Sequence, residues 1–319
     1  MLFGNLVLEL QAMSGIIPVM RSFVLTILCV PLVLSAARPV GLPDIKTAPA
    51  DLTTPELTDG AAAAGRRVKQ VAPEYKGTEV FHTLYLPTDW KPGQKSKYPV
   101  IVEYAGNGPY RNRYGDVSTG KVEGGNLGYG ISGGKGFIWL CLPYVNSKKK
   151  INQRQWWGDV EATVEYCKRT VPRICRRYGG DPSRVVLIGF SRGAVACNYI
   201  GLHDDEIAKL WRAFVPYSHY DGVRKWGYKG SDRASALVRL KRLKGRPQFI
   251  CMENSIDETR RYLKSTGVKG DFTFVVTPFR NHNDRWAHRD SPQRRQLRKW
   301  IAEKTEQCPM TNVQRPSSK

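Results

Sequence analysis

One segment, residues 185–200, constrains the fold of this chain more than any other, because it combines a strand, a tight turn and a helix. It reads Val-Val-Leu-Ile-Gly-Phe-Ser-Arg-Gly-Ala-Val-Ala-Cys-Asn-Tyr-Ile. The apolar run at 185–188 is typical of a buried parallel strand, and the small residues that follow the turn favour a helix packed closely on a sheet. Between them lies a Gly-x-Ser-x-Gly turn, whose glycines permit a close approach of strand and helix. The segment predicts an α/β fold with Ser191 presented above the edge of the sheet.

The residues before this segment strengthen the interpretation of Ser191 as a nucleophile. Residues 179–184 read Gly-Gly-Asp-Pro-Ser-Arg and lead directly into the strand. With the Gly-x-Ser-x-Gly turn, they resemble the approach to the serine in secreted esterases and depolymerases of the α/β-hydrolase superfamily, over roughly residues 79–304. The resemblance implies an α/β-hydrolase fold, with a mostly parallel central sheet flanked by helices on both faces, and a Ser…Asp…His chain order. The alternative is a serine in an ordinary strand–helix turn.

The hydrophobic pattern predicts further strands around this segment. Residues 78–87 alternate and are expected to form an early antiparallel edge strand, and residues 159–178 have helical spacing, with a proline at 172 as a kink or break. The other expected strands are residues 98–104, 136–144, 211–217, 247–252 and 271–278. The glycine-rich stretch 119–136 contains no phosphate-binding Gly-x-x-x-x-Gly-Lys motif, and we expect a flexible loop there.

The other two members of a triad are sought after the last two expected strands. The superfamily places the acid after the strand at 247–252, where Asp257 is the favoured candidate and Glu253 and Asp221 are the alternatives. An N-cap of the following helix is the structural alternative for Asp257. The histidine must follow the strand at 271–278. His282 lies in a polar turn there and is favoured over His288.

Two backbone N–H groups are needed to stabilise the oxyanion of an acyl-transfer reaction. One is expected from Arg192, the residue after the nucleophile. The other is expected from the loop that follows residues 98–104, with Asn107 or Gly108 as candidates, although the typical His-Gly-Gly motif is missing. A plain turn is the alternative for this loop. Three residues are candidates for the substrate pocket: Tyr110, Trp157 and His219.

The basic composition bears on partners. The formal net charge is +22, with 50 Lys and Arg against 28 Asp and Glu. Such a charge favours anionic surfaces. However, zinc-finger spacing and ribonucleoprotein motifs are missing, so nucleic acid is not expected as a partner. Lys148–Lys150 with the nearby tryptophans is better explained as a solvated loop beside a packed helix start.

The N-terminal part has the pattern of an export signal. A charged start at Met20-Arg21 precedes an apolar run at 23–34 and the small residues 35–37, which predicts cleavage near Ala37. We therefore expect a signal peptide over 1–37, with Met20 as a candidate start, a disordered linker over 38–76, a catalytic domain over 77–306 and a disordered tail over 307–319. The chain has seven cysteines, and six remain without Cys29. An exported chain can form disulfides, but no pairing follows from the spacing.

These patterns predict a secreted serine hydrolase. Ser191, Asp257 and His282 would form the triad and an acyl-enzyme, and a carboxylic ester, for example of a polymeric carbohydrate, would be the substrate. A serine peptidase of the prolyl-oligopeptidase type is one alternative. A non-enzymatic module that binds an anionic envelope polymer through its basic face is the other. Neither a cofactor nor a metal is required by any of the motifs.

Overall fold

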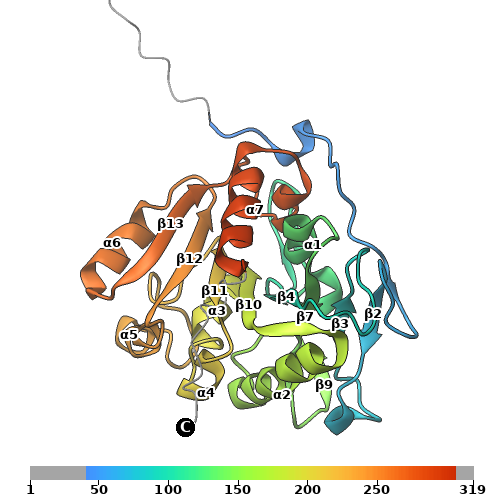
Figure 1. Cartoon of the computed structure of the whole chain (residues 1–319). Helices are drawn as coiled ribbons and strands as arrows, with labels where there is room; N and C mark the ends of the chain where they lie inside the picture. The colour runs from blue at the N-terminus through green and yellow to red at the C-terminus, as the bar shows by residue number, and fades with distance from the viewer. Residues whose placement is uncertain (1–40, 307–319) are drawn as a thin grey trace, which may run out of the picture. The chain divides into compact units, whose positions relative to one another are not determined.

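A nine-stranded sheet lies at the centre of the computed structural model, which describes residues 41–306 (Figure 1). Its strands are, in spatial order, β1 (Leu57–Thr58), β2 (Arg67–Gln70), β3 (His82–Tyr85), β7 (Ile138–Cys141), β4 (Tyr98–Tyr104), β10 (Gly180–Phe190), β11 (Ala213–Tyr217), β12 (Gly245–Met252) and β13 (Gly270–Val276). β3 runs antiparallel to both of its neighbours, whereas the strands from β7 to β13 are all parallel. The predicted mostly parallel sheet is therefore confirmed.

Helices cover both faces of this sheet, as predicted. The helices are α1 (Leu127–Ser132), α2 (Val160–Tyr178), α3 (Arg192–Tyr199), α4 (Asp205–Ala208), α5 (Arg233–Lys241), α6 (Asp257–Thr266) and α7 (Pro292–Thr305). One core cluster contains apolar side chains of α2 to α6, and the other contains those of α1 and α7. Along β10 the side chains alternate between the two clusters, because successive strand residues point to opposite faces. Figure 1 shows α1 and α7 apart from α2 and α4.

The expected secondary structure agrees with the structure for most elements. β4 has the predicted bounds, and α2 begins after Asp159, whose carboxylate accepts a hydrogen bond from the N–H of Ala162 at 3.2 Å. The helix ends at Gly179 in the left-handed conformation, and Pro172 lies within it without ending it. Short segments complete the chain: the hairpins β5 (Tyr110–Arg111) with β6 (Val117–Ser118) and β8 (Tyr144–Asn146) with β9 (Ile151–Gln153), and the 3₁₀ helices η1 (Ile45–Thr47), η2 (Pro73–Tyr75), η3 (Val122–Gly124) and η4 (Asp284–His288).

Three expectations are wrong in the described region. The disordered linker predicted over 38–76 contains ordered structure from residue 41 onward: Val68 of β2 is fully buried, and Arg294 of α7 pairs with Asp51. Ion pairs of Asp44, Asp51 and Glu74 with arginines of the later chain hold this segment, together with isolated buried apolar side chains, and hydrophobic periodicity does not detect such contacts. β3 is consequently not an edge strand, because β1 and β2 lie outside it. The glycine-rich stretch 119–136 contains η3 and α1.

The predicted signal peptide, its cleavage near Ala37 and the tail 307–319 lie outside the described residues. Within residues 41–306, no helix is both long and apolar enough to span a membrane. The cysteines of this region are all buried free thiols: Cys141, Cys167, Cys175, Cys197 and Cys251. Free buried thiols behave as small apolar side chains, and these lie in the core clusters.

Candidate active site

Ser191 lies at the sharp turn between β10 and α3. Its backbone has φ 55° and ψ −121°, a conformation that non-glycine residues rarely adopt and that costs about 1–3 kcal/mol. Its N–H donates to the carbonyl of Tyr217 at 3.0 Å, which fixes the turn to the neighbouring strand. A Cβ on Gly189 would lie 2.1 Å from the carbonyl oxygen of Gly193, and a Cβ on Gly193 would lie 2.1 Å from that of Tyr104. The two glycines thus permit the close strand–helix approach that the sequence indicates.

His282 reaches Ser191 from the loop after β13. Its Nε2 lies 2.9 Å from Ser191 Oγ, and its backbone N–H donates to Asp116 Oδ2 at 3.1 Å. The ring packs 4.7 Å from that of Phe190, measured between centroids. The alternative candidate, His288, is buried elsewhere, with Nε2 2.9 Å from the carbonyl oxygen of Asn126. The geometry therefore places His282, and not His288, beside the serine.

The acid beside His282 is Glu253, and the favoured Asp257 does not occupy that position. Glu253 directly follows β12, and its Oε1 lies 3.1 Å from His282 Nδ1. Asp257 lies in the first turn of α6, where its side chain is 65% exposed and Oδ2 accepts a hydrogen bond from Ser255 at 3.0 Å. The third candidate, Asp221, is paired with an arginine, Arg239, at 2.8 Å. The structure thus corrects the acid of the predicted triad from Asp257 to Glu253.

Ser218 is a second partner of the imidazole that the motif analysis did not identify. Its Oγ lies 2.8 Å from His282 Nδ1, and its backbone has φ 86°. Ser218 directly follows β11, and its N–H donates to the carbonyl of Cys251 on β12 at 2.8 Å. The sequence feature that could have identified Ser218 is its position directly after an expected parallel strand, since ligands of α/β proteins bind at the carboxyl ends of such strands. Ser218 and Glu253 together can hold the Nδ1–H tautomer of His282, which leaves Nε2 free to accept a proton.

Two backbone N–H groups near Ser191 are candidates for stabilising an oxyanion. Arg192 is the first residue of α3, where a backbone N–H has no intrahelical partner. Asn107 lines the same cavity as Ser191. Gly108, the other predicted donor, is excluded because its N–H already donates to the carbonyl of Arg154 at 3.1 Å. The geometry therefore favours Arg192 together with Asn107.

The nucleophile opens into a cavity of about 460 Å³ with aromatic and polar walls. Of the predicted pocket residues, Tyr110 and His219 line it, and their rings lie 5.2 Å and 5.6 Å from that of His282. Trp157 does not, because it stacks on Tyr228 at 5.1 Å. The other lining residues are Asn107, Asn112, Tyr114, Arg192, Trp226, Asn254 and Arg280, with Ser191, Glu253 and His282.

His219 is a neutral group in this cavity. Burial is the largest cause that lowers the pKa of His219 to about 3, and the charges of His282 and Arg192 contribute in the same direction. Its Nδ1 lies 3.3 Å from Ser218 Oγ. A neutral imidazole can exchange hydrogen bonds with a substrate but adds no positive charge beside His282.

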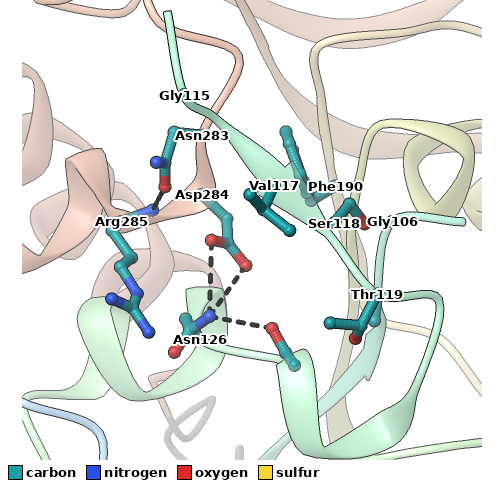
Figure 2. Close-up of a pocket in the computed structure, with 12 residues that line it drawn as sticks. Gly106, Gly115, Val117, Ser118, Thr119, Asn126, Phe190, Asn283, Asp284 and Arg285 are labelled. Carbon is teal, nitrogen blue, oxygen red and sulfur yellow. Dashed lines mark hydrogen bonds between the residues drawn. The ribbon is translucent and has the colours of Figure 1, made fainter. Parts of the chain in front are cut away.

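A second cavity of about 300 Å³ is lined by Gly106 and Phe190, and neither Ser191 nor His282 lines it (Figure 2). Figure 2 shows the carboxylate of Asp284 turned towards the amide of Asn126, and both oxygens lie 3.4 Å from Asn126 Nδ2. Burial, with a smaller contribution from the nearby Glu103, raises the pKa of Asp284 to about 7. Among residues 41–306, no group of three or more His, Cys, Asp or Glu is placed to hold a metal ion.

Comparisons with known proteins identify similar solved structures, whereas no family model and no curated protein matches the chain. The similar structures include an isopeptidase (15% identity, 77% of this chain and 41% of the isopeptidase covered, TM-score 0.49). A putative dipeptidyl aminopeptidase IV from Bacteroides ovatus has 14% identity, 75% and 35% coverage and a TM-score of 0.49. The S-formylglutathione hydrolase of Agrobacterium tumefaciens has 13% identity, 77% and 98% coverage and a TM-score of 0.46. The chain spans less than half of the isopeptidase and of the aminopeptidase.

The strand order and the turn at Ser191 define the fold independently of these likenesses. The sheet is parallel from β7 to β13, and its antiparallel strand β3 lies towards one edge. A strand–turn–helix elbow presents Ser191, and the three hydrogen-bonded residues occur along the sequence in the order serine, acid, histidine, at positions 191, 253 and 282. These features are those of the α/β hydrolases, and the chain has the α/β-hydrolase fold.

Proposed function

We propose that the protein is a serine hydrolase that cleaves carboxylic esters through a Ser191–His282–Glu253 triad. The 2.9 Å distance between Ser191 Oγ and His282 Nε2 carries the proposal, because a serine hydroxyl becomes an effective nucleophile when an adjacent base accepts its proton. Glu253 and Ser218 support it by holding the opposite nitrogen of the ring. A strained serine between two obligatory glycines is a further support, since such strain is characteristic of functional sites.

The reaction would proceed in two halves. Ser191 Oγ attacks the ester carbonyl carbon while its proton passes to His282 Nε2, and the oxyanion accepts hydrogen bonds from the N–H groups of Arg192 and Asn107. The tetrahedral intermediate breaks its bond to the alcohol oxygen, which leaves with the proton from Nε2. Water then attacks the acyl-enzyme and gives its proton to Nε2. Collapse releases the carboxylic acid and returns the proton to Ser191.

The substrate and its location are also part of the proposal. We expect an ester of the kind found on polymeric carbohydrates, and export through the signal sequence predicted over 1–37. The net charge of +22 would favour adsorption to an anionic surface that carries such esters. Several aromatic and amide side chains in the cavity are suited to hold a polar, ring-containing substrate.

Replacement of the nucleophile tests this function. Ser191→Ala is expected to abolish hydrolysis of p-nitrophenyl acetate and covalent labelling by a fluorophosphonate, whereas Ser96→Ala, at an exposed loop position, should alter neither. Circular dichroism checks that both variants fold. A panel of acyl esters against aminoacyl p-nitroanilides then separates an esterase from a peptidase. Labelling that persists in Ser191→Ala, or turnover near that of the wild type, would refute the assignment of the nucleophile.

A further inference from the structure

Arg192 carries a positive charge without a counter-ion on the wall of the nucleophile cavity. Its side chain lines the same cavity as Ser191 and His282. Across the described chain, no carboxylate lies within the 4.0 Å that defines an ion pair with this guanidinium. Its Nη1 is buried and has no hydrogen-bond partner within residues 41–306. Arg192 is therefore a half-buried cation that has neither a carboxylate partner nor, at Nη1, a hydrogen-bond partner among residues 41–306.

This arrangement is costly for the free protein. A buried charge destabilises a fold unless it is paired and hydrogen-bonded. The guanidinium carbon lies 3.0 Å from the centroid of the Trp226 ring, and this cation–π contact offsets only part of the cost. Burial lowers the pKa of Arg192, the Tyr228 hydroxyl opposes this effect, and the positive charge of Arg224 adds to it. A ligand that placed a negative charge beside the guanidinium would offset both its uncompensated positive charge and the repulsion from Arg224.

The other charged groups of the cavity are already paired. Arg280 lies 3.0 Å from Asp44, and Glu253 is held by His282 at 3.1 Å. No other Asp or Glu lines this cavity. One unpaired positive charge thus remains, which matches one carboxylate better than it matches a doubly charged phosphate.

We infer that the substrates of this site are esters that carry a free carboxylate, and that Arg192 is the residue that selects them. This inference rests on the function proposed above. An arginine side chain offers a planar pair of N–H donors that fits both oxygens of a carboxylate. Because Arg192 is adjacent in sequence to the nucleophile and lines the same cavity, the carboxylate would bind in the cavity that holds the ester carbonyl. The neighbouring Trp226 and Asn254 provide an apolar wall and a polar group for the rest of the same molecule.

Two matched substrate pairs test this selection on either side of the ester bond. Monoethyl fumarate and ethyl (E)-4-methylpent-2-enoate differ by a carboxylate in place of an isopropyl group in the acyl part. The rigid trans double bond keeps that carboxylate from attacking its own ester. The second pair, 4-acetoxybenzoate and 4-acetoxybenzamide, places the carboxylate in the alcohol part. Hydrolysis is followed in a pH-stat, and each rate is divided by the hydroxide-catalysed rate of the same ester.

The expected result is a preference for the charged member of at least one pair by about 10-fold or more in kcat/KM, as a charge-assisted hydrogen bond supplies. In Arg192→Gln this ratio should fall towards one. In Arg192→Lys it should lie between the ratio of the wild type and that of Arg192→Gln. Arg176→Gln, an exposed position of α2, removes the same net charge and should leave the ratio unchanged. A wild-type ratio near one for both pairs, or an unchanged ratio in Arg192→Gln, would overturn the inference.

A binding measurement separates this inference from the proposed function. In Ser191→Ala, calorimetry should show tighter binding of the carboxylate ester than of its neutral partner, and equal binding of both members in both pairs would overturn the inference even if Arg192→Gln does not fold. If the wild type cleaves p-nitrophenyl acetate in a Ser191-dependent way but shows no carboxylate preference, only the inference fails. If cleavage does not depend on Ser191, the proposed function fails first.

Discussion

Replacing Glu253 by glutamine tests which carboxylate serves His282. Glu253 Oε1 lies 3.1 Å from His282 Nδ1, whereas the Asp257 side chain is 65% exposed and bonds to Ser255. Glu253→Gln keeps the size of the side chain but removes the charge that stabilises an imidazolium. Asp257→Asn is the matched control, because it removes one carboxylate charge a few residues away. Glu253→Gln should therefore lower kcat, and Asp257→Asn should not.

The size of the effect follows from the contacts at Nδ1. A hydrogen bond to a charged group contributes about 1.5–3 kcal/mol, which corresponds to a loss of about 10- to 150-fold. When an amide replaces the acid of a serine protease triad, the wrong tautomer brings the loss to about 10⁴. Here Ser218 Oγ still lies 2.8 Å from Nδ1 and can accept a hydrogen bond from Nδ1–H, which preserves the tautomer. We therefore expect kcat to fall by about 10- to 150-fold in Glu253→Gln. In the double variant Glu253→Gln with Ser218→Ala, the loss should approach about 10⁴-fold.

The assay is steady-state hydrolysis of p-nitrophenyl acetate, with circular dichroism as a check of folding. The dependence of kcat on pH distinguishes a positioning role of Ser218 from a purely structural one. Loss of Ser218 should shift the acidic limb of the profile, where activity rises as the general base loses its proton, whereas a packing defect would only lower its amplitude. A loss in Asp257→Asn as large as that in Glu253→Gln, or activity within twofold of wild type in Glu253→Gln, would refute the reasoning.

Two further predictions concern stability. Gly193→Ala should lower the free energy of unfolding in urea by about 1–3 kcal/mol or more, because its Cβ would lie 2.1 Å from the Tyr104 carbonyl oxygen. Gly227→Ala is the control, because a Cβ there meets no atom within 4 Å. Equal stability of the two variants would contradict the prediction. Asp284 has a pKa raised to about 7, so the folded state binds a proton that the unfolded state releases, and stability should fall by up to about 4 kcal/mol as the pH rises from about 4 to 7 and then level off. The free energy of unfolding of Asp284→Asn, measured from denaturation curves at pH 5 and pH 8, should change less between the two pH values than that of the wild type. An equal change in the two proteins would argue against a buried, protonated Asp284.

The sequence predicts the sheet well because the strand signal is local. Buried parallel strands are short apolar runs bounded by turn residues, and β4 and the core of β10 have that pattern. β1 and β2 were missed because they depend on tertiary contacts. The segment that contains them is rich in alanine, proline and threonine, and it is anchored by single side chains such as Val68 and Asp51. Periodicity over a window cannot register such isolated anchors.

The acid of the site was mispredicted although the end of its strand was predicted correctly, at Met252. Position in the following loop does not show which carboxylate turns towards the histidine. Glu253 is the first residue past the strand, and its side chain spans the distance to His282. Asp257 was favoured because it lies further along the loop. It belongs instead to the first turn of α6, where a negative charge interacts favourably with the helix dipole. The structural alternative for this aspartate was therefore nearer to its actual position.

The register of the parallel strands explains why these particular residues meet. Phe190 pairs with Tyr217, and Tyr217 pairs with Cys251, so β10, β11 and β12 reach the same level at their carboxyl ends. Ser191 and Ser218 directly follow the paired residues Phe190 and Tyr217, and Glu253 lies two residues past Cys251. A histidine from the next strand must cross back over the sheet to reach the serine, which needs a loop. β13 ends at Val276, and the residues between it and His282 form this loop. A histidine directly after β13 would lie beside β12, the strand with which β13 pairs. The order of the strands thus determines which side chains can act together, and the loop length selects the histidine.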